Sequence, residues 1–266
     1  TGISGEDVEL QVKEDASVQV DTDVQNLVVN GTGKSINLDT SNQGNIEILD
    51  NSSVVLNAPN SIGYLKLTSN GNVEITDASS LLGNAIISAI GTVDINNISA
   101  LEGKLTVENI RGPTGADVNI ANANSAKSVE VKTVGAVIID STNGGLNEAE
   151  SISITSSEDS TIIASKDIPR TVELEAININ EELVTFDLNI NGLNNLGLGG
   201  TSPILVNAAG SAIDGVTVTS NNTATTSLNL TSANMDLSGI SNTIQIQLEN
   251  LDGKNLTLGS NQLIAL

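Results

Sequence analysis

Short aliphatic pairs of the form Φ-x-Φ recur along this chain in two interleaved series, each with a period near twenty residues. The first series begins at Val8, Leu27, Ile46, Leu65, Ala85 and Leu105, and the second at Val18, Ile36, Val54, Val73 and Val93. A fixed period of this length is typical of solenoids, in which each repeat buries its apolar face only against its neighbours.

The stretch from Leu65 to Ile75 shows how one repeat is built. Leu65-Lys66-Leu67 and Val73-Glu74-Ile75 each place a charged residue between two aliphatic ones. This alternation predicts strands that turn their aliphatic side chains toward a core and Lys66 and Glu74 toward solvent. We therefore expect an all-β fold, a right-handed parallel β-solenoid (β-helix) with about two short strands in each ~20-residue coil. About 12 or 13 coils would stack ~4.8 Å apart.

An antiparallel sandwich is the alternative, because its strands also recur every 8–12 residues or so. The spacing in this chain is more constant, and Asn-Gly turn signals do not separate every pair of strands. Tyr64 and Phe186 are the only aromatic residues. A core made almost entirely of Val, Ile, Leu and Ala suits narrow stacked coils better than a broad sandwich, so the solenoid is favoured.

The repeat becomes less regular along the second half of the chain. Arg111-Gly112-Pro113 interrupts it, and a longer run with Phe186 is followed by the Gly-rich residues 191–200. We therefore divide the chain into a regular solenoid over residues 1–180 and a second part over residues 181–266. The second part is either a continuation of the solenoid or a second β-rich subdomain, and a continuous rod is the favoured interpretation.

Composition excludes several function classes. The chain has no His and no Cys, which removes Ser-His-Asp and Cys-His catalysis and most zinc sites. A net charge of −22 disfavours nucleic acid and anionic lipid as partners. No apolar run approaches the ~20 residues of a membrane span. Paired carboxylates could still hydrolyse glycosides, but aromatic and basic side chains that hold sugars are scarce, so we expect no enzymatic activity, no nucleic-acid partner and no membrane insertion.

A polar residue follows the second strand of successive repeats, and this column could hold calcium. Its members are Asp21, Asp39, Asn57, Thr76 and Asn96. Stacked oxygen ligands suit Ca²⁺, whereas the alternative is a ladder of side chains that bond the turns of successive coils. The ladder is the favoured interpretation. Asp21, Asp23 and Asp39 are the best calcium candidates, because stacked carboxylates repel one another without a cation or solvent.

Four acidic pairs in predicted loops could also bridge calcium between molecules. They are Glu6-Asp7, Glu14-Asp15, Glu158-Asp159 and Glu181-Glu182. Such pairs are more often solvated loop charges. Ca²⁺ is thus the one cofactor that the sequence suggests.

The stretch from Ser128 to Asp140, SVEVKTVGAVIID, combines a strand, a short glycine turn, a second strand and an Asp. It recurs more loosely from Ser151 to Ala164, and most of the chain has the same style. In this the chain resembles the solenoids of bacterial surface-layer (S-layer) proteins. The resemblance implies a secreted, extracellular protein of the bacterial cell surface that assembles with copies of itself into a lattice, in many cases with Ca²⁺. The Gly-Gly-x-Gly-x-Asp calcium repeats of many such proteins are absent.

Passenger and haemagglutinin-like adhesin repeats are the second resemblance, since they also stack ~20-residue coils. Asn72–Thr76 and Gly91–Asn96 fit them equally well. An adhesin stalk would bind a host surface or cell-envelope polysaccharide rather than copies of itself. A polysaccharide-active solenoid would need an Asp/Glu cluster in a groove, which the sequence does not indicate. The chain opens Thr1-Gly2 without a signal peptide, and we expect a mature form or an excised region.

Overall fold

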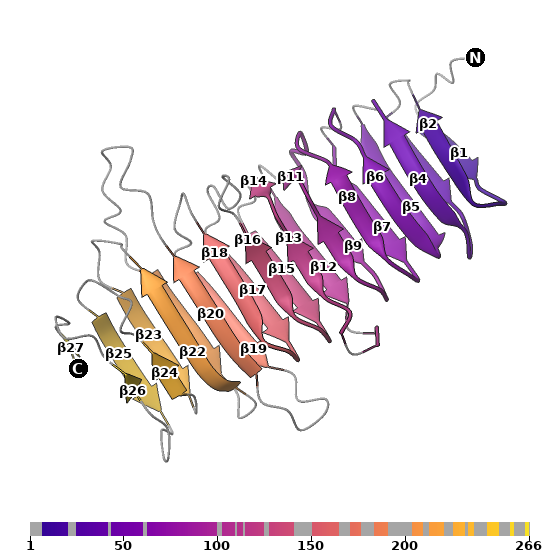
Figure 1. Cartoon of the computed structure of the whole chain (residues 1–266). Coiled ribbons are helices and arrows are strands. Elements are labelled where there is room, and N and C mark those ends of the chain that lie inside the picture. Colours follow the sequence, from indigo (N-terminus) through magenta and orange to yellow (C-terminus); the bar gives the residue numbers. More distant parts are fainter. Residues whose placement is uncertain are drawn as a thin grey trace.

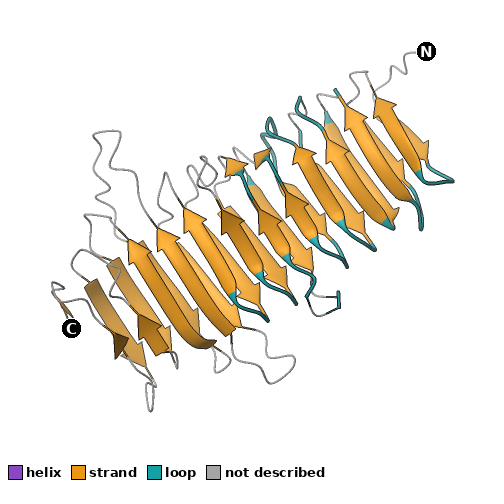
Figure 2. Cartoon of the chain, viewed as in Figure 1, coloured by secondary structure: helices purple, strands orange, loops and turns teal. Residues whose placement is uncertain are grey.

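The computed structural model is an all-β rod of stacked coils (Figures 1 and 2). It describes residues 7–20, 25–41, 44–60, 63–99, 103–109, 111–113, 115–124, 128–140, 151–164, 171–176, 184–190, 204–209, 213–220, 226–231, 234–236, 244–249, 256–257 and 264–265.

Odd and even strands separate into two parallel sheets for most of the rod, because each coil contributes one strand to each sheet. Sheet A has 13 strands. They are β1 (Asp7–Gln11), β3 (Asn26–Asn30), β5 (Asn45–Asn51), β7 (Leu65–Ser69), β9 (Ala85–Ser88), β12 (Lys104–Asn109), β15 (Ser128–Thr133), β17 (Ser151–Ser156), β19 (Thr171–Ala176), β21 (Ile204–Ala209), β23 (Thr226–Thr231), β25 (Ile244–Glu249) and β27 (Ile264–Ala265).

Sheet B has 12 strands and faces sheet A across the core. They are β2 (Ala16–Val20), β4 (Ser35–Thr40), β6 (Ser53–Asn57), β8 (Val73–Asp77), β10 (Val93–Ile95), β13 (Val118–Ile120), β16 (Val137–Asp140), β18 (Ser160–Ala164), β20 (Val184–Ile190), β22 (Ile213–Ser220), β24 (Asn234–Asp236) and β26 (Leu256–Thr257). A small third sheet pairs β11 (Ile98–Ser99) with β14 (Ala123–Asn124).

The predicted parallel solenoid with two strands per coil is therefore confirmed, and the antiparallel sandwich is wrong. The register follows the first Φ-x-Φ series, because Val8 pairs with Leu27, Leu27 with Ile46 and Ile46 with Leu65. The second series needs one correction. Val18 pairs with Leu38, and Ala16 is the residue that pairs with Ile36. The alternation favoured Val18 as the first member because alanine in a strand gives only a weak apolar signal.

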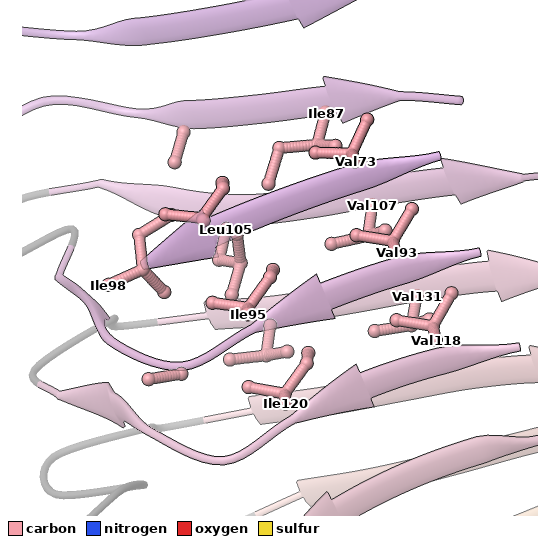
Figure 3. Close-up of a cluster of buried hydrophobic side chains, with 14 of the residues drawn as sticks. Val73, Ile87, Val93, Ile95, Ile98, Leu105, Val107, Val118, Ile120 and Val131 are labelled. Carbon is pink, nitrogen blue, oxygen red and sulfur yellow. The ribbon is translucent and has the colours of Figure 1, made fainter. Parts of the chain in front are cut away.

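The core is a double row of aliphatic side chains between the sheets. Figure 3 shows Val107 of sheet A beside Val93 of sheet B, and Val131 beside Val118, in successive coils. Leu65, Leu67, Val73 and Ile75 are buried, whereas Lys66 and Glu74 between them are exposed, as the alternation predicts. Burying one such aliphatic side chain is worth about 1.5–3 kcal/mol, so the stacked rows stabilise every coil against its neighbours.

The interruption at Arg111-Gly112-Pro113 lengthens one turn without moving the strands. Val93 pairs with Val118, a step of 25 residues. Asn109, fully buried at the end of β12, closes this turn because its Nδ2 donates to the carbonyls of Gly91 (2.8 Å) and Ala116 (2.7 Å). One amide thus replaces backbone bonds that the inserted residues would otherwise leave unmade.

Both ladders continue beyond residue 180. Strand β18 pairs with β20 and β20 with β22, while β19 pairs with β21. Phe186, within the longer apolar run, is fully buried. The division of the chain into residues 1–180 and 181–266 stays a prediction.

Candidate functional site

A column of Asp and Asn side chains runs along one corner of sheet B, where the calcium column was predicted. Asn57 Nδ2 donates to Asp39 Oδ1 (3.1 Å), Asn97 Nδ2 to Asp77 Oδ1 (3.0 Å), and Asn122 Nδ2 to Asn97 Oδ1 (3.0 Å). Each bond joins neighbouring coils through an amide N–H. The first four members are, in order, Asp39, Asn57, Asp77 and Asn97. Amides and carboxylates alternate along them, so no two carboxylates stack directly. The ladder interpretation describes this column.

The membership of the column differs from the predicted one in the coils of Thr76 and Asn96, and also at the first coil, where Gln19 takes the register position predicted for Asp21. Asn57 pairs with Asp77, and a bulge between Leu56 and Asn57 moves Thr76 out of line. Asp77 and Asn97 therefore take the places predicted for Thr76 and Asn96. A one-residue bulge cannot be inferred from spacing alone, because the aliphatic pairs on either side keep their period.

The calcium candidates are only partly visible. Asp21 and Asp23 lie outside the described residues, and Gln19 rather than Asp21 is the register partner of Asp39. Asp39 is exposed and already accepts from Asn57. Within the described ranges, no three His, Cys, Asp or Glu residues are placed to hold a metal ion together. Calcium at Asp21, Asp23 and Asp39 stays a prediction.

A second device joins coils at the start of the strands. In it, an Asn or Asp that directly precedes a strand, or is its first residue, accepts a bond from the backbone N–H of the equivalent residue one coil later. Asn45 Oδ1 accepts from Tyr64 N (3.0 Å) in sheet A, and Asn72 Oδ1 accepts from Thr92 N (3.1 Å) in sheet B. The further examples are Asp15 with Ser35, Asn84 with Lys104, Asp117 with Ala136 and Asp159 with Thr185. We call this contact the coil staple.

Glycine makes room for four of the staples. A Cβ on Gly91 would lie 2.1 Å from Asn72 Oδ1, and one on Gly63 would lie 2.2 Å from Asn45 Oδ1. Gly103 and Gly135 stand in the same relation to Asn84 and Asp117. The glycine precedes the staple's N–H donor by one residue, and its missing Cβ is what lets the acceptor approach the backbone.

The staple also accounts for two of the acidic pairs. Asp15 of Glu14-Asp15 and Asp159 of Glu158-Asp159 are staple acceptors, at 2.8 Å and 2.7 Å. Asp7 accepts from Asn26 Nδ2 at 2.5 Å. Glu6 and Glu181-Glu182 lie outside the described residues. The carboxylates of Asp7, Asp15 and Asp159 therefore bond between coils of the same chain. Bridging of calcium between molecules stays a prediction.

The outward face of sheet A has a cluster of opposite charges. Lys104 and Lys132, from neighbouring strands, both pair with Glu130, and the Lys132 Nζ–Glu130 Oε1 distance is 2.8 Å. The hydrogen bonds from Lys104 and then Lys132 hold the pKa of Glu130 below its ordinary value, against a smaller opposing effect of burial. The bond and the charge of Glu130 raise the pKa of Lys132.

Tyr64 lies on the same face and is partly exposed. Its hydroxyl donates to Glu47 Oε1 at 3.1 Å. Partial burial, followed by this bond and by the charge of Glu47, raises the pKa of the Tyr64 hydroxyl. The phenol therefore stays protonated and donates to the carboxylate.

A shallow groove opens on sheet A where β7, β9 and β12 end. It has a volume of about 170 Å³, and it is lined by Thr68, Ser69, Asn70, Ser88, Ala89, Ile90, Glu108 and Arg111. Thr68, Ser88 and Glu108 share one outward column, because Ser88 pairs with both of the others. Ligand pockets are commonly about 300–1,000 Å³, so this groove suits a single side chain better than a whole small molecule.

No family model matches this chain, and neither a curated protein nor a solved structure matches it. Among the residues that the structure describes, no helix has the length and apolar character needed to cross a membrane.

Sequence reasoning missed the staple and the groove for different reasons. The staple has a signal in the sequence. An Asn or Asp directly precedes one Φ-x-Φ pair, as Asn72 does, and a Gly lies two residues before the Φ-x-Φ pair of the next coil, as Gly91 does. The groove has none, because it joins residues from three coils with an inserted turn, and only the stacking brings Thr68 near Arg111.

Proposed function

We propose that this chain is a non-enzymatic structural β-solenoid of a bacterial cell surface that assembles with copies of itself into an S-layer-type lattice. The observation that carries the proposal is the continuity of the two ladders, from β1 to β27 in sheet A and from β2 to β26 in sheet B. Such a rod holds two extended outward faces in fixed relation to each other. Repeated faces of this kind suit a building block that contacts its neighbours along its length.

The interior of the described coils supports a structural role. Nearly every inward position from Leu27 to Val137 is a fully buried aliphatic residue, and the inward polar residues at the corners bond the turns. The buried aliphatic residues and the hydrogen bonds of the corner side chains thus both join each coil to the next. The extracellular location, the self-partner and a contribution of Ca²⁺ belong to the same proposal and rest on the S-layer resemblance.

Light scattering of the purified chain tests the proposal. Calcium is added stepwise at constant ionic strength and then removed with a chelator, and magnesium serves as the control cation. Growth into large assemblies that electron microscopy shows as sheets supports the lattice. Reversal by the chelator, without the same response to magnesium, supports a role of calcium.

A chain that stays monomeric at all concentrations, with and without calcium, contradicts the lattice. That outcome favours the second resemblance, an adhesin stalk that binds a host surface or cell-envelope polysaccharide. Assembly that is indifferent to calcium and chelator keeps the lattice and removes the cation from the proposal.

A further inference from the structure

The two outward faces of the solenoid differ in charge. In the described part of the chain, the lysines that belong to strands all lie in sheet A, as Lys66 of β7, Lys104 of β12 and Lys132 of β15. Arg111 lies two residues past the end of β12 and is exposed in the groove. The strands of sheet B contain no basic residue. In the same coils sheet B carries Glu74, which is exposed, and Asp94, which is half-buried.

The basic side chains stand out against the composition of the chain. Only 10 residues are basic against 32 acidic ones, yet four of the ten lie on or beside sheet A between β7 and β15. The side chains of Lys66, Lys104 and Lys132 are 47%, 44% and 46% exposed. Glu108 and Glu130 are the acidic residues of the same described strands, so four basic side chains against two acidic ones make this part of sheet A a net cationic strip on an acidic molecule.

Apolar side chains lie on the same strip. Among the described residues, the large hydrophobic side chains that are exposed are Tyr64 (37%), Leu82 (42%), Ile86 (45%) and Ile138 (43%). The first three belong to two neighbouring coils, because Gly83 N donates to Gly63 O and Ile86 pairs with Lys66. Ile138, the fourth, lies on sheet B.

Arg111 is the cation of the strip with no ion pair to any carboxylate in the described part of the chain. Lys66, Lys104 and Lys132 each contact a Glu of sheet A. Arg111 instead lines the groove with Thr68 and Ser88. A guanidinium can bind a carboxylate through two parallel hydrogen bonds, and the groove has room for one side chain. On sheet B, Glu74 is an exposed carboxylate that likewise has no ion pair among the described residues.

From these observations we propose that the β7–β15 face of sheet A docks onto the acidic sheet B face of a second copy of this chain. Arg111 receives a carboxylate of that copy, with Glu74 the first candidate. Tyr64, Leu82 and Ile86 form the apolar part of the same contact, toward the start of β7 and β9. The two faces are different surfaces on opposite sides of the rod. We call this contact, between the sheet A face of one copy and the sheet B face of the next, head-to-back. The assembly keeps one free face of each kind at its ends, so the contact propagates into an open row of parallel or tilted rods.

This inference rests on the proposed self-assembly and specifies its contact. The net charge of −22 opposes association at long range, and salt screens that repulsion beyond about 8 Å at 0.15 M. Apolar contact and close opposite charges act only within the docked pair. We therefore expect association to need moderate ionic strength and to respond to single charge reversals at the two faces.

Analytical ultracentrifugation of the wild-type chain at 0.15 M salt, with three charge-reversal variants, tests the contact. Arg111→Glu alters the sheet A face, and Glu74→Lys alters the sheet B face. Lys13→Glu is the matched control, because Lys13 is exposed in the turn of the first coil. We expect Arg111→Glu and Glu74→Lys each to weaken association at least tenfold, and Lys13→Glu to change it less than twofold. Circular dichroism confirms that each variant is folded.

An equimolar mixture of the Arg111→Glu and Glu74→Lys chains provides the second measurement. In this contact, each variant keeps one intact face, so the mixture forms hetero-pairs through the wild-type faces. The two altered faces have exchanged charges and attract each other again where Arg111 met Glu74. Recovery in the mixture of the association that each variant alone has lost is the expected result, and a mixture that associates no better than either variant alone contradicts the pairing of Arg111 with Glu74.

Two results overturn the inference, and they differ in what they leave standing. If the wild type assembles and both face variants assemble as well as Lys13→Glu, the head-to-back contact is wrong while self-assembly stands. If the wild type stays monomeric at every concentration and salt, self-assembly and the contact both fall.

Discussion

The coils from β1 to β16 and those from β17 to β27 share the same two ladders but are connected differently. From Val8 to Leu105 the steps along sheet A are 19 or 20 residues. Later, Val172 pairs with Val206, a step of 34, and in sheet B Ile162 pairs with Leu188, a step of 26. The strands keep their register although the chain between them varies in length.

This difference shows that the buried pairs, and not the length of the turns, set the register. A shift by one residue would turn the aliphatic face of a strand to solvent. A longer connection costs little by comparison, because each doubling of a flexible loop costs only about 0.6 kcal/mol of closure entropy. Insertions therefore accumulate in the connections while the ladders stay continuous.

Truncating a buried leucine in each region is expected to have the largest effect on the free energy of unfolding, and it compares the two regions directly. Leu67 in β7 and Leu188 in β20 are both fully buried. We expect Leu67→Ala and Leu188→Ala each to lower the free energy of unfolding by about 2–5 kcal/mol, measured by urea denaturation. A cost for Leu188→Ala below 1 kcal/mol would contradict the view that the buried rows hold both regions. The exposed Ile86→Ala is the control, with a much smaller expected change.

The staples that include a glycine give a smaller expected effect, and they join coils whose steps are 19 or 20 residues. In Gly91→Ala the new Cβ would meet Asn72 Oδ1 at 2.1 Å and the Gly71 carbonyl carbon at 2.7 Å. We expect a loss of about 1–3 kcal/mol, measured by thermal and urea unfolding. Thr92→Ala is the matched control, because it alters the next residue and keeps the N–H that Asn72 accepts from. Equal stability of the two variants would show that this close approach is not needed.

The ion pairs of Glu130 give the smallest effect, and it depends on pH. Because Lys104 and Lys132 lower the pKa of Glu130 in the folded state, the ionised form stabilises the fold above the unfolded pKa, near 4.3. That contribution is lost as the pH falls through the lowered folded value. We expect wild type to exceed Glu130→Gln in stability by less than about 1 kcal/mol at pH 7, since the group is close to solvent.

Urea denaturation from pH 7 to pH 3 measures this difference. It should shrink below about pH 4, where the unfolded state binds the proton while folded Glu130 is still ionised, and it should level off once both states are protonated. Glu74→Gln, which removes an exposed carboxylate from sheet B, is the control and should show a smaller difference at pH 7. A difference between wild type and Glu130→Gln that grows toward low pH would have the wrong sign and would exclude the ion pairs as its cause.

Local pattern was enough to predict the fold class and most of the register. Period-two alternation in segments such as Leu65-Lys66-Leu67 fixes which side chains are buried, and the constant spacing fixes which segments stack. The exceptions are local. The bulge at Thr76 and the start of β2 at Ala16 leave the aliphatic period unchanged, so the pattern contains no signal for them.

The sequence by itself determined the parallel solenoid, the aliphatic core and the solvent-facing charges, because these depend on the period of residues close together in the chain. Only the tertiary structure decided that Asp39 bonds to an amide, that Arg111 shares a groove with Thr68, and that the lysines gather on one sheet. These are relations between coils, and they depend on small differences in register and turn length. A few residues more or less in a turn change which side chains stack, although the strands and the core remain the same.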